Sequence, residues 1–243
     1  MSTLSTPQFA PTTPPSGPTT ASTRKRAIFV GLLFLNATAA FIVADILNSG
    51  VLSRPDFLAG ASAESTSLAT GALLLYGQFG VVGIAVLLFP LLKRYGESGA
   101  LAHVGFRVAE LAASLFVLSV PLMAIELGAA VSDGSLDASG SASLSALLQG
   151  QYSVAVLLMY LTTAAAGMCM TLLLYRSRLI PRPLAVLGLI TYPTFLAGSI
   201  LDIFNVVDMT QGLGLVALVP GTVFELVMPI WLIAKGFSFP SHD

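Results

Sequence analysis

The sequence predicts an all-α fold, a polytopic transmembrane bundle of six helices, and three observations support this fold class. Of the 243 residues, 55% are hydrophobic and only 9% are charged, whereas soluble domains carry about 25% charged residues. The mean hydropathy is +0.87. Six apolar runs are long enough, at about 1.5 Å per helical residue, to cross roughly 30 Å of hydrocarbon. These runs are continuous and do not alternate as the strands of a membrane barrel do, so helices are favoured.

The chain divides into an arm, a membrane domain and a tail. Residues 1–23 are rich in Pro, Ser and Thr and predict a disordered arm, residues 24–236 form the six-helix transmembrane domain, and residues 237–243 form a short polar tail. The predicted spans are Ala27–Leu47, Leu68–Leu92, Ala100–Leu127, Tyr152–Tyr175, Pro183–Phe204 and Leu213–Ala234.

The loop charges predict a cytoplasmic N-terminus and a cytoplasmic C-terminus, because Lys-rich and Arg-rich loops stay in the cytoplasm. Nine of the eleven Lys and Arg fall on one side: Arg24, Lys25, Arg26, Lys93, Arg94, Arg176, Arg178, Arg182 and Lys235. The other side has Arg54 together with Asp56, Glu64, Asp133, Asp137 and Asp208. We therefore expect a multi-pass protein of the cytoplasmic (bacterial inner) membrane, with the lipid bilayer as its surroundings.

One alternative concerns the first span, because its basic start and apolar run are followed by Ala37-Thr38-Ala39, which resembles a signal-peptide cleavage site. The apolar sequence continues beyond that site, and the whole run fits a span better than a short signal sequence. Cleavage would leave five helices.

Composition also excludes several classes of function. A net charge of −1 offers no basic field for nucleic acid. A single cysteine, Cys169, and two histidines, His103 and His242, leave no internal disulfide and no multi-cysteine or histidine-cluster metal site, so we expect neither a metal nor a cofactor. The hydrolase, nucleotide-binding and zinc motifs are absent from the sequence.

The third span holds the densest set of polar residues. His103, Arg107, Glu110 and Ser114 follow one another at intervals of four, three and four residues, which places them along one helix face. Charges at bilayer depth must face protein, water or a partner. The spacing predicts an intrahelical Arg107–Glu110 pair, which either holds the bundle together or forms part of a polar cavity.

Glu225 lies mid-way along the sixth span, three residues after Thr222 and four before Pro229. Proline cannot donate to the carbonyl one turn earlier, so a free acceptor is predicted beside this acid. We expect Glu225 to lie at the depth of the Arg107–Glu110 pair, where Arg107 could serve both acids.

A second group of acids, Asp45, Glu126 and Asp202, lies toward the outer ends of three spans. No cation is predicted at that depth, which leaves them protonated, bound to a metal ion, or solvated at the interface. Hydrogen-bonding groups at intermediate depth are candidate ligand-binding residues together with Arg107 and His103: Tyr76, Gln78, Tyr160 and Tyr192.

Features in this order resemble a bacterial membrane family known as a domain of unknown function, DUF4386. The resemblance covers roughly residues 24–236 and includes Arg24-Lys25-Arg26 before Gly31-Leu32-Leu33, Phe106-Arg107 with Glu110, the turn Leu179-Ile180-Pro181-Arg182-Pro183-Leu184, and Glu225 before Trp231-Leu232-Ile233-Ala234-Lys235-Gly236. It implies a bundle of six or seven helices and no established activity.

Three functional hypotheses follow. In the first, the protein binds or transports a small hydrophobic or weakly acidic molecule in an intramembrane pocket centred on the charged residues of the third and sixth spans. In the second, a buried carboxylic acid is the general acid of an enzyme for a lipid-soluble, isoprenoid-like substrate. The candidate catalytic acids are Glu110, Glu225, Asp45, Glu126 and Asp202. In the third, the protein is a structural or assembly subunit.

Overall fold

The computed structural model describes residues 20–209 and 212–238, which form eight α-helices and two short 3-10 helices. The helices are α1 (Thr20–Leu52), α2 (Phe57–Ala61), α3 (Ser65–Leu75), η1 (Tyr76–Gln78), α4 (Phe79–Leu92), η2 (Lys93–Tyr95), α5 (Glu97–Ser132), α6 (Ala138–Ser177), α7 (Arg182–Ile203) and α8 (Leu213–Lys235). The class is all-α, as predicted.

Among the described residues, six helical segments are long and apolar enough to cross a membrane, which confirms the predicted number of candidate spans. The candidate spans are Ser22–Leu52, Ser65–Tyr95, Glu97–Ser132, Ala138–Ser177, Arg182–Ile203 and Leu218–Lys235. Large apolar side chains on their outer surfaces are exposed, such as Phe29, Leu73 and Phe116, which are 60%, 74% and 61% exposed. Such surfaces suit contact with lipid better than with water.

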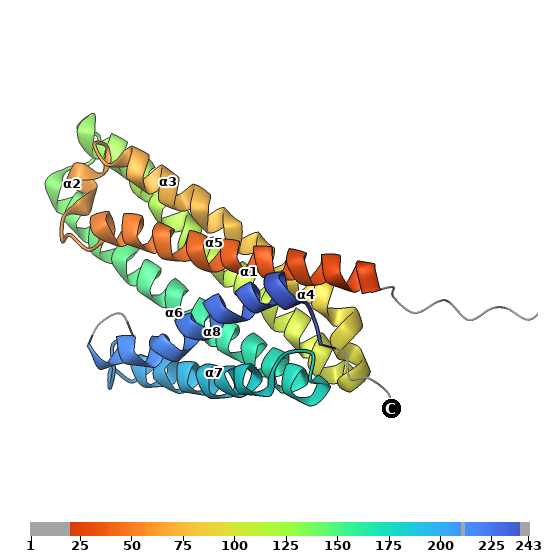
Figure 1. The fold of residues 1–243 in the computed structure, drawn as a ribbon. Helices are drawn as coiled ribbons and strands as arrows, with labels where there is room; N and C mark the ends of the chain where they lie inside the picture. Colours follow the sequence, from red (N-terminus) through yellow and green to blue (C-terminus); the bar gives the residue numbers. More distant parts are fainter. Residues whose placement is uncertain (1–19, 210–211, 239–243) are drawn as a thin grey trace, which may run out of the picture.

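The contacts between the spans, which Figure 1 shows from the side, close into a ring. Going round the ring, α1 contacts α8, α8 contacts α7, α7 contacts α6, α6 contacts α5, and α5 contacts α3 and α4, which return to α1. The start of α1 meets the end of α8, where the Arg24 guanidinium donates to the carbonyls of Leu232, Ile233 and Ala234 at 3.1, 2.7 and 3.2 Å. Because successive spans alternate in direction, the nine cations of the predicted cytoplasmic side lie at this end of the ring.

The second predicted span, Leu68–Leu92, was expected to be one helix and is instead two helices joined by η1. At this break Gln78 turns inward and its Nε2 donates to the Ala37 carbonyl of α1 at 3.1 Å. A Cβ atom at Gly77 would lie 3.1 Å from the Ala40 side chain. The close approach of α1 therefore favours a glycine at this break.

Four helices extend beyond the predicted spans at the end opposite the cations: α1, α3, α5 and α6. Helix α6 starts fourteen residues before the predicted Tyr152, because Asp137 caps it by accepting the backbone N–H of Gly140 at 2.8 Å. At about 1.5 Å per residue its 40 residues span roughly 60 Å, more than the hydrocarbon needs. Here the short helix α2, which was not predicted, buries Phe57 and Leu58 against α5 and α6.

The predicted arm and tail fall largely outside the described residues. Residues 1–19 and 239–243 are not described, and His242 is among them. Helix α1 includes Thr20, so the last four residues assigned to the arm are helical. In the tail, Phe237 packs on the core and the Ser238 N–H donates to the Leu179 carbonyl at 2.8 Å.

Candidate functional site

The polar face predicted on the third span lies on α5 and points into the ring. His103, Arg107, Glu110 and Ser114 are all at most 3% exposed. The His103 Nδ1 lies 2.9 Å from the Ala166 carbonyl, and the Ser114 hydroxyl donates to the Glu110 carbonyl at 2.8 Å. These two outer members of the face thus bond to helix backbones, whereas the two central residues bond to each other.

Arg107 and Glu110 form the predicted intrahelical ion pair. The Nη1 of Arg107 donates to both carboxylate oxygens of Glu110, at 3.0 and 2.8 Å. The guanidinium also lies over the Phe34 ring of α1, 5.6 Å from its centroid. Within residues 20–209 and 212–238, the Nε and Nη2 of Arg107 are buried and have no hydrogen-bond partner. The Arg107–Glu110 pair has no net charge, and the guanidinium keeps two donor nitrogens that no described residue uses.

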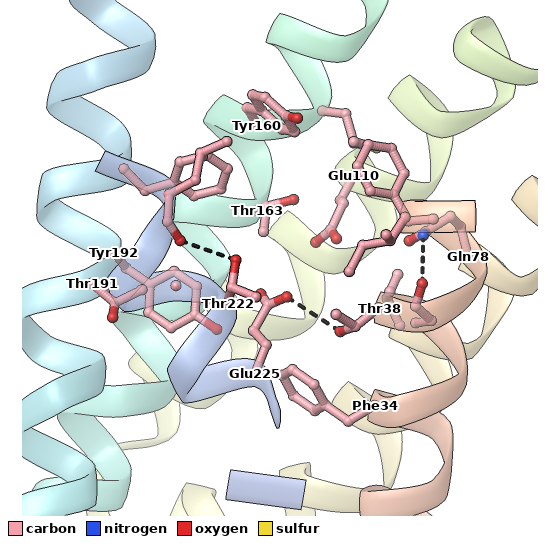
Figure 2. Close-up of a pocket in the computed structure, with 18 of the residues that line it drawn as sticks. Phe34, Thr38, Gln78, Glu110, Tyr160, Thr163, Thr191, Tyr192, Thr222 and Glu225 are labelled. Atoms are coloured by element: carbon pink, nitrogen blue, oxygen red, sulfur yellow. Dashed lines mark hydrogen bonds between the residues drawn. The ribbon is translucent and has the colours of Figure 1, made fainter. Parts of the chain in front are cut away.

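Glu225 extends from α8 toward the same space (Figure 2). The Thr38 hydroxyl of α1 donates to its Oε2 at 3.2 Å. The fully buried Tyr192 of α7 lies beside Glu225, within reach of its carboxylate. Glu225 is close enough to interact with Arg107, although its hydrogen bond goes to Thr38.

These side chains line a cavity of about 260 Å³ at the centre of the ring. All six candidate spans contribute to its wall, which is mostly apolar, and Figure 2 shows its polar groups converging from α1, η1, α5, α6, α7 and α8. Of the predicted site residues, the cavity brings together Asp45, Gln78, Arg107, Glu110, Tyr160, Tyr192 and Glu225.

Asp45 lines the cavity next to a row of aromatic rings. Its Oδ1 accepts the Tyr152 hydroxyl at 3.0 Å. Phe41, one helical turn before Asp45, meets the Tyr160 ring edge-to-face with centroids 6.2 Å apart, and Tyr160 in turn lies 4.9 Å from the Phe195 ring. All three rings belong to the cavity wall.

Four predicted site residues lie elsewhere. Tyr76 is 59% exposed on the outside of the ring, where its ring stacks on Phe79 at 4.4 Å. Glu126 is exposed on α5, and the carboxylate of Asp202 accepts the Met209 N–H at 3.2 Å, which ties the end of α7 to the following loop. His103 faces α6 outside the cavity lining.

Several residues of the cavity wall were not among the predicted site residues. Thr38, Phe41 and Asp45 follow one another at helical intervals of three and four and share one face of α1. That spacing could have linked the threonine and the phenylalanine to the aspartate. Phe195 gave no such signal, because only the packing of α6 against α7 brings it to Tyr160.

The cavity has no obvious metal-binding chemistry. Within the described ranges, no three His, Cys, Asp or Glu side chains gather as a metal site would require.

Comparison with known proteins identifies the family. Residues 29–236 match the family described as "Domain of unknown function (DUF4386)", which is more than half of the chain. The chain belongs to the DUF4386 family. The match spans all six candidate spans except the first residues of α1, so the cavity lies wholly within the family domain. No curated protein and no solved structure matches the chain.

Proposed function

We propose that this DUF4386 protein binds a small hydrophobic molecule with at least one polar group in the central cavity. The observation that supports it most is the cavity itself, about 260 Å³ of space among buried, partly unpaired polar groups. Ligand sites are typically concave and mostly apolar, with a few convergent polar groups. The Nε and Nη2 of Arg107 and the Thr191 Oγ1 are buried without partners in the described chain, and a ligand could supply those partners.

The position of the cavity favours a ligand that comes from the lipid. Ile46 of α1 and Thr222 of α8 both line the cavity and are exposed. The cavity therefore opens between α1 and α8, within two candidate spans. A molecule that dissolves in the bilayer can reach this opening without crossing water.

A matched pair of variants at Gly221 tests ligand binding. A Cβ atom at this position would lie 3.5 Å from the Thr191 methyl group, an ordinary contact, so Gly221→Ala should leave the cavity largely open. Gly221→Phe would fill the cavity, since Gly221 is part of its wall. Gly105→Phe is the control, because a Cβ there meets nothing within 4 Å.

The readout is mass spectrometry of organic extracts from protein purified in nanodiscs. A molecule retained by the parent, Gly221→Ala and Gly105→Phe but absent from Gly221→Phe supports the proposal. Equal retention by all four folded proteins contradicts it.

An enzyme that uses a buried general acid is the second candidate, and the observation in its favour is that Glu225 and Asp45 face an apolar cavity. Extracts of whole cells distinguish it from binding alone. A new compound that disappears in cells expressing Glu225→Gln or Asp45→Asn would establish catalysis, whereas an unchanged retained molecule favours binding.

We also propose that the cation-rich end of the ring faces the cytoplasm, in the cytoplasmic membrane, because Lys and Arg gather there. In a Cys169→Ser background, a membrane-impermeant maleimide should label Ser135→Cys in intact cells and Ser98→Cys only after permeabilisation. These two exposed serines lie at opposite ends of α5. The reverse labelling pattern would overturn this orientation.

A further inference from the structure

We propose that the ligand of the central cavity is a lipophilic cation, such as a hydrophobic amine, whose charge is held by Asp45 and Glu225 and by the aromatic rings beside Asp45. This inference rests on the proposed binding function and names the chemical class of the ligand.

The charges of the cavity wall do not balance. Its charged residues are Arg107, Glu110, Glu225 and Asp45. In the portion of the chain that the structure describes, the ion pairs are Arg107–Glu110 and the distant, exposed Arg54–Glu64. Glu110 contacts the one cation directly and Glu225 lies within range of it, so the wall has two more carboxyl groups than cations.

Each of these two carboxyl groups receives a hydroxyl hydrogen bond, from Tyr152 to Asp45 at 3.0 Å and from Thr38 to Glu225 at 3.2 Å. A neutral hydroxyl orients a carboxylate but does not neutralise it. An ionised group held in apolar surroundings is costly unless it is paired. A monovalent cationic ligand would balance one of the two excess carboxyl charges and lower the cost of holding the other in the same cavity.

The aromatic wall supplies the second recognition element. The Phe41, Tyr160 and Phe195 rings form a continuous row along the cavity, and Phe41 precedes Asp45 by one helical turn. Ring faces attract ammonium groups, and most strongly where water is excluded. An ammonium group at this point would meet a carboxylate and aromatic surface together, while its apolar substituents fill the rest of the cavity.

The same geometry disfavours a weakly acidic ligand, which was one alternative in the first functional hypothesis. Glu110 already holds this guanidinium at 2.8 and 3.0 Å, so an added ligand carboxylate would meet two uncompensated acids. The Nε and Nη2 of Arg107, which have no hydrogen-bond partner in the described residues, can donate to a neutral oxygen of the ligand. These buried groups point to a ligand independently of the acids.

The experiment compares two probes of the same shape. Benzyltrimethylammonium carries a charge, and neopentylbenzene replaces its nitrogen with carbon. Binding to the full-length protein in phosphatidylcholine nanodiscs is measured for the parent and for Asp45→Asn, Glu225→Gln and Tyr160→Leu. The amides retain the oxygens that accept from Tyr152 and Thr38. Asp202→Asn changes an acid outside the cavity and is the control. Tyr160→Phe keeps the ring and is the conservative variant to compare with Tyr160→Leu.

We expect the cation to bind more tightly than the neutral probe. Asp45→Asn, Glu225→Gln and Tyr160→Leu should each weaken cation binding at least tenfold, and Tyr160→Phe should bind the cation more tightly than Tyr160→Leu does. Cation binding by Asp202→Asn and the affinity of the neutral probe should change less than threefold. If the neutral probe binds equally well, or the amides leave cation binding intact, the assignment of a cation is overturned while binding in the cavity stands.

The natural ligand gives an independent outcome. A molecule retained by the parent and lost in Gly221→Phe supports the inference if it is an amine or another cation, and overturns it if it is an acid or a neutral compound. Retention unaffected by Gly221→Phe, with neither probe bound, would refute the binding function itself.

Discussion

Replacing Arg107 and Glu110 by methionine, singly and together, tests whether the ion pair of α5 is a coupled unit. Both side chains are at most 4% exposed, and the Arg107 Nη1 contacts both carboxylate oxygens at 2.8 and 3.0 Å. Removing one partner leaves the other as an uncompensated buried charge, which typically costs about 3–5 kcal/mol. Replacing both by apolar groups of similar volume is often neutral or stabilising.

We therefore expect each single variant to lose about 3–5 kcal/mol of unfolding free energy and the double variant to stay within about 1 kcal/mol of the parent. The assay is reversible unfolding of detergent-solubilised protein, followed by circular dichroism. The exposed pair Arg54–Glu64, with side chains 55% and 39% exposed, is the control and should give about 0–1 kcal/mol in the same cycle. Single variants that each lose less than 1 kcal/mol, or a double variant that loses the sum, would refute this reasoning.

Three further predictions concern packing and helix ends. Gly167→Ala should destabilise the protein by about 1–3 kcal/mol, because the new methyl group would overlap the Tyr192 ring, whereas Gly105→Ala has open space and should be neutral in the same unfolding assay. Arg24→Ala should cost about 1–2 kcal/mol, because the last-turn carbonyls of α8 lose a charged donor, and Arg24→Lys should recover part of the loss in thermal unfolding. The pKa of Asp137 lies below its ordinary value of 3.8, because its carboxylate accepts a backbone N–H at the start of α6. This stabilisation is present above pH 3.8 and is lost as the pH falls through the lower pKa of the folded state. The melting temperature of Asp137→Ala should therefore be below that of the parent at pH 7, and the two melting temperatures should converge in acid.

Each of these predictions has a contradicting result. An unaltered melting temperature for Gly167→Ala would mean that the Tyr192 ring can move aside. Equal stability of Arg24→Ala and the parent would mean that the α1–α8 contact does not depend on this guanidinium. A melting-temperature difference for Asp137→Ala that persists in acid would show that its cause is not the charged cap.

The sequence by itself determined the fold class and the number of candidate spans, because burying backbone polar groups in lipid requires long, continuous apolar helices. The order of its short motifs was enough to indicate the family. It also determined the Arg107–Glu110 pair, since residues three apart on a helix are neighbours whatever surrounds them. The break at Gly77 was not predicted, because it depends on a neighbouring helix. The early start of α6 was not predicted either, although its N-cap, Asp137, is a signal that the sequence contains.

Only the tertiary structure decided which polar residues meet. Tyr76 and Tyr192 both occur in apolar candidate spans, yet one stacks on the outer surface and the other is fully buried beside Glu225. Likewise, Asp45 lines the cavity while Asp202 binds a loop N–H. In a soluble helix the polar face marks the outside, but a lipid-facing side is as apolar as the core. The charged face of α5 revealed its rotation, whereas a span without such a face does not reveal its rotation in its sequence. That rotation is fixed by the packing of the six-span ring, and it creates the cavity.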